Sequence, residues 1–158
     1  MRVGIGYDIH RLGNKGPLVL GGVKIPHDKG LLAHSDGDVL CHAVCDALLG
    51  AAGLPNIGEL FPDTDPAYKD SNSMELLGVV VSRLSDAGYA PVQLDANIIA
   101  QKPKLQPYQA EMCKNLALCL QVEPGCISVK PRTNEGVGPE GREEAVSVQA
   151  VVLIQKII

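Results

Sequence analysis

The segment from residue 36 to residue 52 constrains the fold more than any other part of this sequence. Its apolar side chains recur at helical spacing in two adjacent stripes, which are Val39, Ala43, Ala47 and Gly50, with Leu40, Val44, Leu48 and Ala51 beside them. A helix this apolar has to be mostly buried, so other elements must cover it. We expect Ser35 to cap its N-terminus and Asp38 to reach back to the cap. Because a helix N-terminus presents free backbone N–H groups, His34 and Ser35 are predicted to lie at an anion site.

The same helix carries polar residues at intervals of four. Asp38, His42 and Asp46 therefore share one helical face. A carboxylate at Asp46 is costly among apolar residues unless it is paired, and one alternative is that it anchors the unbound nitrogen of a ligating histidine. Cys41 and Cys45 flank the face of His42, but they point about 100° away from it, so we expect small core residues rather than metal ligands.

Residues 2–10 alternate in the manner of a β-strand. Val3, Ile5, Tyr7 and Ile9 form an apolar face, and the other face consists of Gly4, Gly6, Asp8 and His10. We expect the two glycines to keep that second face open. Asp8, His10 and His42 together offer one carboxylate oxygen and two imidazoles, which suits zinc or another divalent ion with a fourth, open position. The alternative for Asp8 and His10 is a solvated strand end.

The remaining elements predict an α+β fold. A hairpin covers 18–25 around Gly21-Gly22, and helices follow from Asn72 to Gly88 and from 107 to 121, with Gly125 as the stop. Strands are expected at 92–100, 127–130 and 145–154, and the last of these is apolar enough to be central. We therefore predict one catalytic domain over residues 1–158, a single-domain sandwich of a mixed β-sheet with helices on one face. The other face has a polar row that favours an oligomer interface: Gln93, Asp95, Asn97, Ser147 and Gln149.

Composition narrows the possible partners and the compartment. The chain of 158 residues has 14 basic and 18 acidic side chains and a formal net charge of −4, so we expect no nucleic-acid partner. No apolar run approaches the roughly 18 residues that a membrane span needs, so no membrane association is expected. Five cysteines without a secretory leader indicate free thiols in a reducing compartment, which we take to be the cytoplasm.

Two loops have the composition of functional segments. Residues 53–72 are rich in Pro, Asp and Gly and are predicted to form a lid-like loop pinned by Phe61, the alternative being a plain surface connection. In the second loop, Thr133 and Glu135 lie close to basic residues that suit a magnesium-bound polyphosphate, namely Lys130, Arg132 and Arg142. The alternative for Glu135 is a solvated carboxylate. No nucleophile set of the Ser-His-Asp or Cys-His kind is evident.

Several longer motifs are specific enough to carry a resemblance. They are Gly6-x-Asp8-x-His10, Leu31-Leu32-Ala33-His34, the run from Ser35 to Ala51, Leu60-Phe61-Pro62-Asp63-Thr64-Asp65 and Ile98-Ile99-Ala100-Gln101-x-Pro103-Lys104. In these stretches, over essentially its whole length, the chain resembles the 2-C-methyl-D-erythritol 2,4-cyclodiphosphate synthase family of the non-mevalonate isoprenoid pathway.

The resemblance implies a CMP-forming phosphorus–oxygen lyase. Such an enzyme converts 4-diphosphocytidyl-2-C-methyl-D-erythritol 2-phosphate to the 2,4-cyclodiphosphate by metal-assisted intramolecular phosphoryl transfer, in a homotrimer with active sites between subunits. Zinc or another divalent transition metal would bind Asp8, His10 and His42, and magnesium or manganese would bind Glu135. His34 and Thr133 would be the catalytic residues.

The resemblance also implies a substrate-binding set drawn from both halves of the chain. It comprises Asp8, His10, His34, Ser35, Asn56, Ile57, Gly58, Phe61, Asp63, Ala100, Pro103, Lys104, Leu105, Thr133, Asn134, Glu135 and Arg142. Within this set, the cytidine pocket would consist of Ala100, Pro103, Lys104 and Leu105.

The chain departs from the family pattern at a few positions. Arg132 and Asn134 flank Thr133 where the family usually reads Thr-Thr-Thr-Glu. Asn56 replaces a usual Asp that contacts the methylerythritol hydroxyls, and because Asn keeps an acceptor and adds donors, we expect retuned binding. Pro139 and Glu143 replace a usual Phe and Gly near the trimer axis, which leaves open whether isoprenoid diphosphates bind there.

Two other functions stay open from the residues. A zinc phosphodiesterase would use a metal-bound water and release a linear product. A non-catalytic binder of isoprenoid diphosphate or nucleotide would bind without turnover.

Overall fold

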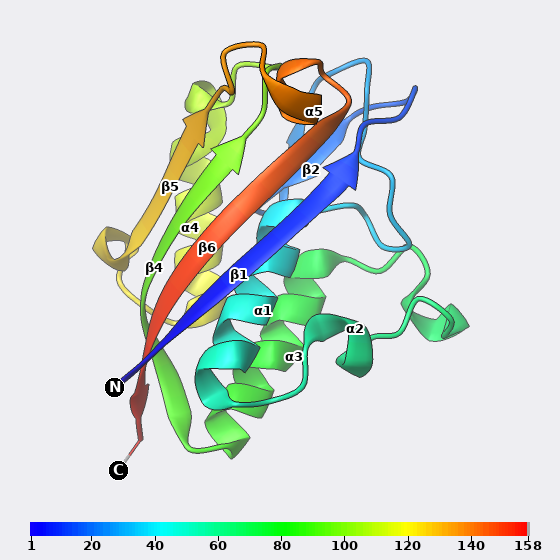
Figure 1. The fold of residues 1–158 in the computed structure, drawn as a ribbon. Coiled ribbons are helices and arrows are strands. Elements are labelled where there is room, and N and C mark those ends of the chain that lie inside the picture. Colours follow the sequence, from blue (N-terminus) through cyan, green and yellow to red (C-terminus); the bar gives the residue numbers. More distant parts are fainter. Residues whose placement is uncertain (158) are drawn as a thin grey trace.

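The structure is a computed structural model that describes residues 1–157. A four-stranded mixed sheet is covered on one face by the longer helices, and a two-stranded hairpin lies beside it (Figure 1). The elements are, in order, β1 (Arg2–Arg11), β2 (Leu18–Leu20), β3 (Val23–Ile25), α1 (Val39–Ala52), α2 (Ile57–Leu60), the 3₁₀ helix η1 (Pro66–Tyr68), α3 (Ser73–Asp86), β4 (Tyr89–Ile99), η2 (Gln106–Tyr108), α4 (Gln109–Leu120), η3 (Pro124–Cys126), β5 (Ile127–Arg132), α5 (Gly138–Gly141) and β6 (Ala145–Lys156). This arrangement confirms the predicted α+β class.

The strand order of the sheet is β1-β6-β4-β5. Strand β6 is central and runs antiparallel to both β1 and β4, whereas β4 and β5 are parallel. The central position predicted for the last strand is therefore confirmed. As a consequence, β1 and β5 form opposite edges of the sheet (Figure 1), and side chains at these two edges are separated by the two strands between them.

Helix α1 packs directly on β1 and β6, and this contact corrects the role expected for the glycines of β1. Gly4 and Gly6 are buried beneath the helix. A Cβ atom at Gly4 would lie 1.9 Å from the Ala47 carbonyl oxygen, and one at Gly6 would lie 1.9 Å from that of Ala43. The glycines therefore do not leave an open face; they allow the helix backbone to approach the strand. The apolar face of β1 is the exposed one, with Ile5 74% exposed.

The start of α1 differs from the prediction. Asp38, and not Ser35, is the N-cap, and its carboxylate accepts a hydrogen bond from Cys41 N at 3.0 Å. The same carboxylate accepts hydrogen bonds from the backbone N–H groups of Gly21 at 3.0 Å and Gly22 at 2.8 Å, in the turn between β2 and β3. A fully buried carboxylate thus accepts hydrogen bonds from the free backbone N–H groups of both the helix N-terminus and the hairpin turn. His34 and Ser35 lie in the preceding loop, so the prediction that they sit on a helix N-terminus is wrong.

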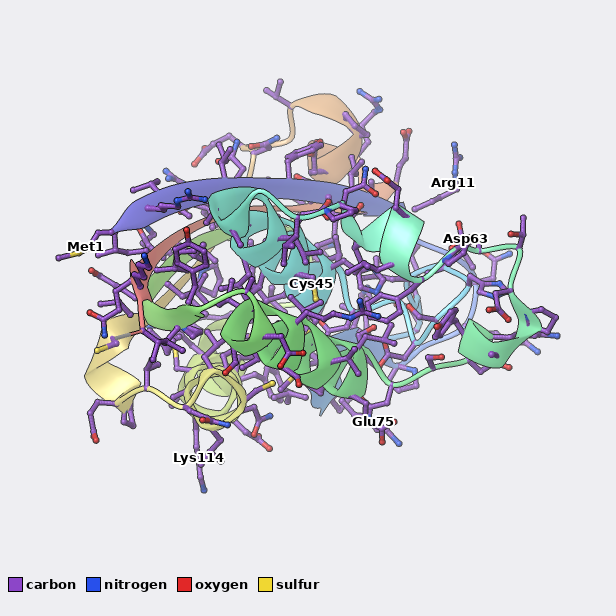
Figure 2. All side chains as sticks on the ribbon, turned by 90° about the horizontal axis from the view of Figure 1, so that it is seen from below. Met1, Arg11, Cys45, Asp63, Glu75 and Lys114 are labelled. Carbon is purple, nitrogen blue, oxygen red and sulfur yellow. The ribbon has the colours of Figure 1, made fainter. Side chains whose placement is uncertain are left out.

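Most other element predictions are confirmed. Asn72 caps α3 by accepting from Met74 N at 2.9 Å. Helix α4 ends earlier than predicted, at Leu120, because Gln121 takes the left-handed conformation (φ 57°), and Gly125 instead lies in η3. Cys41 and Cys45 are fully buried, as predicted, and Figure 2 shows Cys45 between α1 and α3.

The three long helices, α1, α3 and α4, pack on one face of the sheet and form the core with it. Core side chains from α1, α3 and α4 meet the inward-facing residues of β4 and β6, such as Leu94, Ile98 and Val148. Across residues 1–157, no helix has the length and apolar character needed to cross a bilayer.

Candidate metal centre and neighbouring pockets

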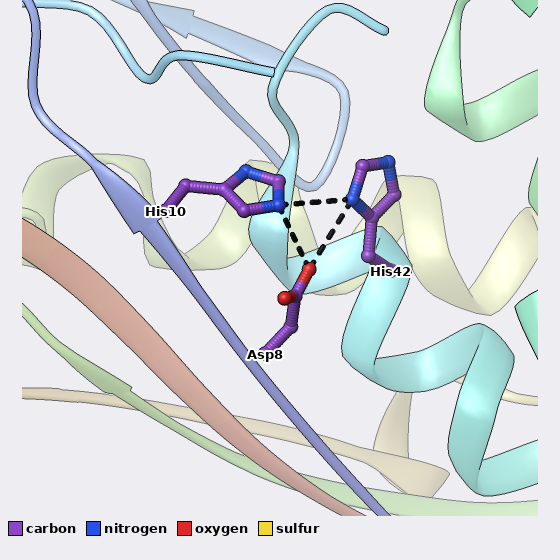
Figure 3. Close-up of side chains that lie close together, drawn as sticks. All are labelled: Asp8, His10 and His42. Atoms are coloured by element: carbon purple, nitrogen blue, oxygen red, sulfur yellow. Dashed lines mark hydrogen bonds and ion pairs between the residues drawn. The ribbon is translucent and has the colours of Figure 1, made fainter. Parts of the chain in front are cut away.

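Asp8, His10 and His42 converge at one point between β1 and α1. Asp8 Oδ2 lies 2.9 Å from His10 Nε2 and 3.3 Å from His42 Nδ1, and the two nitrogens are 3.4 Å apart (Figure 3). The two strand residues face the same side because they are two positions apart, and His42 comes from the first turn of the helix. The sequence-based prediction that these three side chains meet is therefore confirmed.

The spacing of these three donor atoms suits a tetrahedral cation. Metal–ligand bonds of about 2.0–2.1 Å at tetrahedral angles place ligand atoms about 3.3–3.4 Å from one another. Two of the three observed separations fall there, at 3.3 and 3.4 Å, and the third is somewhat shorter, at 2.9 Å. Among the described residues, this is the single group of at least three His, Cys, Asp or Glu side chains that are close enough to hold a metal ion. The three side chains thus form a candidate site for a divalent metal, with three protein ligands.

Electrostatics favour a charged carboxylate at Asp8. Burial raises the pKa of this carboxyl, but its short contacts with His10 and His42 and the attraction of their rings outweigh burial, so its pKa lies well below the usual range. Burial lowers the pKa of His10, and the hydrogen bond and the attraction to Asp8 outweigh burial and raise it. The carboxylate is therefore prepared to bind a cation.

Asp46 does not anchor a histidine. Its carboxylate accepts a hydrogen bond from Ile57 N at 2.8 Å and so attaches α2 to α1. The alternative in which Asp46 holds the unbound nitrogen of a ligand is therefore wrong, although Asp46 is paired, as its position on an apolar helix required. The outer nitrogens of the two histidines face other groups: His10 Nδ1 lies 3.1 Å from Gly37 O, and His42 Nε2 lies 2.9 Å from Ser73 Oγ.

A first pocket of about 340 Å³ adjoins the metal cluster, and we call it the metal-side pocket. Eight of its lining residues belong to the predicted site. They are His10, His34, Ser35, His42, Ile57, Gly58, Phe61 and Asp63. Asn56 lies next to them as the N-cap of α2, where its side chain accepts from Glu59 N at 3.0 Å. Two of the three metal ligands, His10 and His42, and residues of loop 53–72 therefore border one cavity.

Loop 53–72 is ordered by its own contacts. Phe61 meets Tyr68 edge to face, with ring centroids 5.2 Å apart, and packs partly against the core. The loop also contains α2 and η1. Phe61 thus pins the loop, as predicted. The structure favours an ordered loop with its own short helices over a plain surface connection.

A second pocket, of about 570 Å³, lies at the opposite edge of the sheet, and we call it the edge pocket. It is formed where β4 and β5 end, and it contains the predicted residues Ala100, Pro103, Lys104, Leu105 and Thr133. Lys102, Lys130 and Arg132 also line it, so positive side chains surround a partly apolar floor. Such a lining suits a nucleotide, which offers a ring and phosphates.

The remaining predicted residues lie on the open face of the sheet or beside it. Asn134 and Glu135 line a hollow there with Thr133, and Glu135 N donates to Thr133 Oγ1 at 3.3 Å. Arg142 pairs with Glu144, Nε to Oε1 at 3.0 Å, and lines neither the metal-side pocket nor the edge pocket. Within residues 1–157, Glu135 does not belong to any group of three or more side chains close enough to hold a metal ion.

Some lining residues were missed from the sequence. Leu32, Tyr68 and Leu76 line the metal-side pocket, and Gln101, Gln106 and Gln109 line the edge pocket. Their residue types carry no chemical signal, so only proximity in sequence to the predicted residues, as for Gln101, pointed toward them. Ser73, which contacts His42 Nε2, and Asp36, which contacts Ser73, were also missed.

Comparison with known proteins gives matches over the whole chain. A model of the YgbB family matches residues 1–155. The chain is 54% identical over 155 residues to a 2-C-methyl-D-erythritol 2,4-cyclodiphosphate synthase of Salinibacter ruber, covering 98% of this chain and 99% of that protein. It is 51% identical over 156 residues to the protein of the same name in Dechloromonas aromatica, covering 99% and 98%.

Solved structures agree in fold. A CDP complex of IspF from Plasmodium falciparum superposes with a TM-score of 0.86 at 35% identity, covering 99% of this chain and 97% of that one. The bifunctional IspDF of Campylobacter jejuni superposes with a TM-score of 0.95 at 43% identity, and there this chain spans 42% of the larger protein.

Proposed function

This chain belongs to the YgbB family, and we propose that it is a CMP-forming cyclodiphosphate synthase of non-mevalonate isoprenoid biosynthesis. It converts 4-diphosphocytidyl-2-C-methyl-D-erythritol 2-phosphate to 2-C-methyl-D-erythritol 2,4-cyclodiphosphate. The observation that carries this proposal is the convergence of Asp8, His10 and His42 beside a pocket lined by His34, Ser35 and loop 53–72.

The bond changes are confined to the substrate. An oxygen of the 2-phosphate forms a bond to the β-phosphorus, and the bond from that phosphorus to the bridging oxygen breaks, so that CMP leaves with the oxygen. A phosphate oxygen is already a nucleophile, so no protein base has to remove a proton. Because both reacting groups belong to one molecule, the main task of the protein is to hold it in ring-closing geometry.

We assign the metals by ligand chemistry. Asp8, His10 and His42 would hold zinc or another divalent transition metal, and Glu135 would bind magnesium or manganese, which often takes one carboxylate together with substrate phosphates. When bound, these cations offset the negative charge on the phosphates.

The chain's own residues position the two ends of the substrate. His34 and Ser35 contact the diphosphate, and residues of loop 53–72 enclose the methylerythritol part and exclude water, among them Asn56, Ile57, Gly58, Phe61 and Asp63. The edge pocket receives cytidine against Ala100, Pro103, Lys104 and Leu105, and Thr133 binds the phosphates there by hydrogen bonds. Asn134 contacts the substrate from the adjoining hollow.

We propose that the active site is completed between subunits of a homotrimer. The metal-side pocket lies by β1 and the edge pocket by β5, at opposite edges of the sheet, so one substrate cannot occupy both pockets of one subunit. The open face of the sheet supports an assembly, because Val3, Ile5 and Tyr7 of β1 are exposed there beside Val151. Asp95 Oδ1 and Asn97 Oδ1, on the polar half of that face, have no hydrogen-bond partner among residues 1–157. A neighbouring subunit would bury the apolar side chains and supply donors to these oxygens.

Two further features complete the proposal. Residues 1–158 act as one catalytic domain, and the enzyme works in the cytoplasm, where five free cysteines remain reduced. We assign Arg142 to the trimer axis on the family resemblance, and its pairing with Glu144 outside both pockets is compatible with that place.

Product analysis tests the proposed function. The purified chain is incubated with the authentic substrate, zinc and magnesium, and the products are identified by mass. We expect the cyclic diphosphate and CMP in equal amounts. A linear, hydrolysed product would instead support a phosphodiesterase, and tight CDP binding without turnover would support a non-catalytic binder.

A further inference from the structure

The outer nitrogen of His42 contacts two serine hydroxyls. Its Nδ1 faces Asp8 and His10, whereas its Nε2 lies 2.9 Å from Ser73 Oγ and 3.1 Å from Ser35 Oγ. An imidazole binds a metal only through a nitrogen that carries no proton, so Nδ1 is available only when the proton resides on Nε2. Whether His42 can be a ligand therefore depends on what its Nε2 contacts.

The hydrogen-bond partners of Ser73 decide the direction of this contact. Ser73 is fully buried at the first position of α3, and its hydroxyl donates to Asp36 Oδ1. A carboxylate only accepts hydrogen bonds, so the single hydroxyl proton of Ser73 is committed to Asp36. The oxygen of Ser73 can then only accept from His42, which requires the proton on Nε2.

Asp36 is held rigidly enough to perform this role. Its Oδ2 accepts from Ser73 N at 3.0 Å, its Oδ1 also accepts from Asp38 N at 3.1 Å, and its own N–H donates to Ser71 O at 3.0 Å. These contacts join the loop before α1 to the start of α3. The carboxylate therefore cannot turn away from Ser73 without breaking several hydrogen bonds.

We propose that Asp36 and Ser73 are positioning residues that fix His42 as the Nε2–H tautomer and aim its Nδ1 at the metal. The proposal rests on the metal site assigned to Asp8, His10 and His42 above. Outer partners of ligating histidines are usually a carboxylate, a carbonyl or water, and here a serine relays the carboxylate to the ring.

The two ligating histidines differ in this respect. The outer nitrogen of His10 faces the backbone carbonyl of Gly37, which no substitution of a side chain removes directly. The carboxylate one turn beyond His42, Asp46, is occupied by Ile57 N. Ser73 Oγ lies closer to His42 Nε2 than Ser35 Oγ does, and the Ser35 hydroxyl, which also lies 3.4 Å from Ser73 Oγ and accepts from Gly37 N at 3.4 Å, borders the metal-side pocket.

The first test compares Ser73→Ala with Ser85→Ala, an exposed serine on the same helix. Zinc affinity is measured by competition with a chromophoric chelator on the full chain. We expect Ser73→Ala to weaken zinc binding about 10- to 100-fold and Ser85→Ala to leave it unchanged. Circular dichroism confirms that both variants are folded.

The second test reads the tautomer itself. In metal-free protein with ¹⁵N-labelled histidine, long-range ¹⁵N–¹H spectra distinguish Nε2–H from Nδ1–H rings, and four histidines keep the assignment tractable. We expect wild-type His42 to be Nε2–H. In Asp36→Asn the amide can donate to Ser73, whose proton then turns to Nε2, so the population with Nδ1–H should rise.

The outcomes separate this inference from the proposed function. If both Ser73→Ala and Asp36→Asn keep the wild-type zinc affinity and the Nε2–H ring, the positioning role is wrong. If wild-type protein binds no zinc or other divalent metal, the proposed metal site is wrong, and the spectra of the variants still decide whether the relay sets the tautomer. If one variant fails to fold, the other carries both measurements.

Discussion

The metal-side pocket and the edge pocket are assembled in different ways. The metal-side pocket draws its polar groups from β1, the loop before α1, α1 itself and loop 53–72, which meet only through tertiary packing. The edge pocket is lined mainly by two short runs, residues 100–106 and 130–133, at the ends of neighbouring parallel strands, with Gln109 beside them. The first pocket therefore depends on distances between elements, and the second depends mainly on the local course of the chain.

This difference predicts how each pocket fails. A small change in the packing of α1 on β1 moves a metal ligand, so the metal-side pocket should lose function abruptly. The edge pocket offers exposed lysines that contribute separately, so its losses should be graded.

The largest effect is expected from removal of a metal ligand. His42→Ala should abolish metal binding at the cluster and lower the rate of CMP release by about 1,000-fold or more, because charge on the phosphates is no longer offset. CDP binding to the edge pocket should persist. Metal analysis of the purified protein, steady-state kinetics of CMP release and titration with CDP measure metal binding, catalytic rate and CDP affinity, respectively. His27→Ala, which changes a histidine that pairs with Asp28, is the matched control and should behave as wild type; an active, metal-free His42→Ala protein would refute the assignment.

The next largest effect should come from a residue that contacts neither metal nor substrate. In Gly6→Ala the new methyl group would overlap the carbonyl oxygen of Ala43, so α1 must move away from β1. We expect a loss of unfolding free energy of about 2–3 kcal/mol and weaker metal binding, with CDP binding retained. Chemical denaturation and chelator competition measure both changes.

Gly50→Ala, a substitution in α1, provides the control for this prediction. No atom lies within 4 Å of a Cβ built there, so the substitution should raise the unfolding free energy by about 0.5–1 kcal/mol and leave metal affinity unchanged. Equal metal affinity in Gly6→Ala and Gly50→Ala would contradict the idea that the close contact between β1 and α1 sets the ligand geometry.

A smaller effect is expected at the edge pocket. Lys104→Ala removes one charged donor, which should weaken CDP binding about tenfold without changing metal affinity. Calorimetric titration with CDP measures it, and Lys114→Ala, an exposed lysine on α4, is the control. Loss of metal binding in Lys104→Ala would show that the two pockets are coupled within one subunit.

The smallest effect should follow Asn56→Asp. Asp is as good an N-cap as Asn, so the unfolding free energy should change by less than about 0.5 kcal/mol. The KM for substrate should change by about two- to tenfold, because one hydrogen-bonding group facing the substrate changes character. An unchanged KM would place Asn56 outside substrate contact.

The sequence predicted the parts of the site that depend on local periodicity. Asp8 and His10 share a strand face, and His42 lies on an apolar helix, so their convergence followed once the helix had to cover the strand. The edge pocket was predicted only through the family resemblance, because residue types such as those of Ala100 and Pro103 do not by themselves indicate a binding site.

The parts that were not predicted depend on distances between elements. The role of Gly4 and Gly6 is set by how closely α1 approaches, which alternation along β1 cannot reveal. Ser35 and Asp38 are both good caps within four positions, and only the turn at Gly21 and Gly22 selects Asp38. The hydrogen bond from Ser73 to Asp36 joins residues 37 positions apart.

The opposite-edge placement of the pockets has a genetic consequence under the proposed assembly. A subunit that has lost His42 keeps an intact edge pocket, and a subunit whose edge pocket has been destroyed keeps an intact metal cluster. In cells that make both in equal amounts, random mixing would pair two intact halves at about a quarter of the interfaces. Two alleles that each fail alone would then restore growth together, whereas two alleles damaged in the same pocket would not.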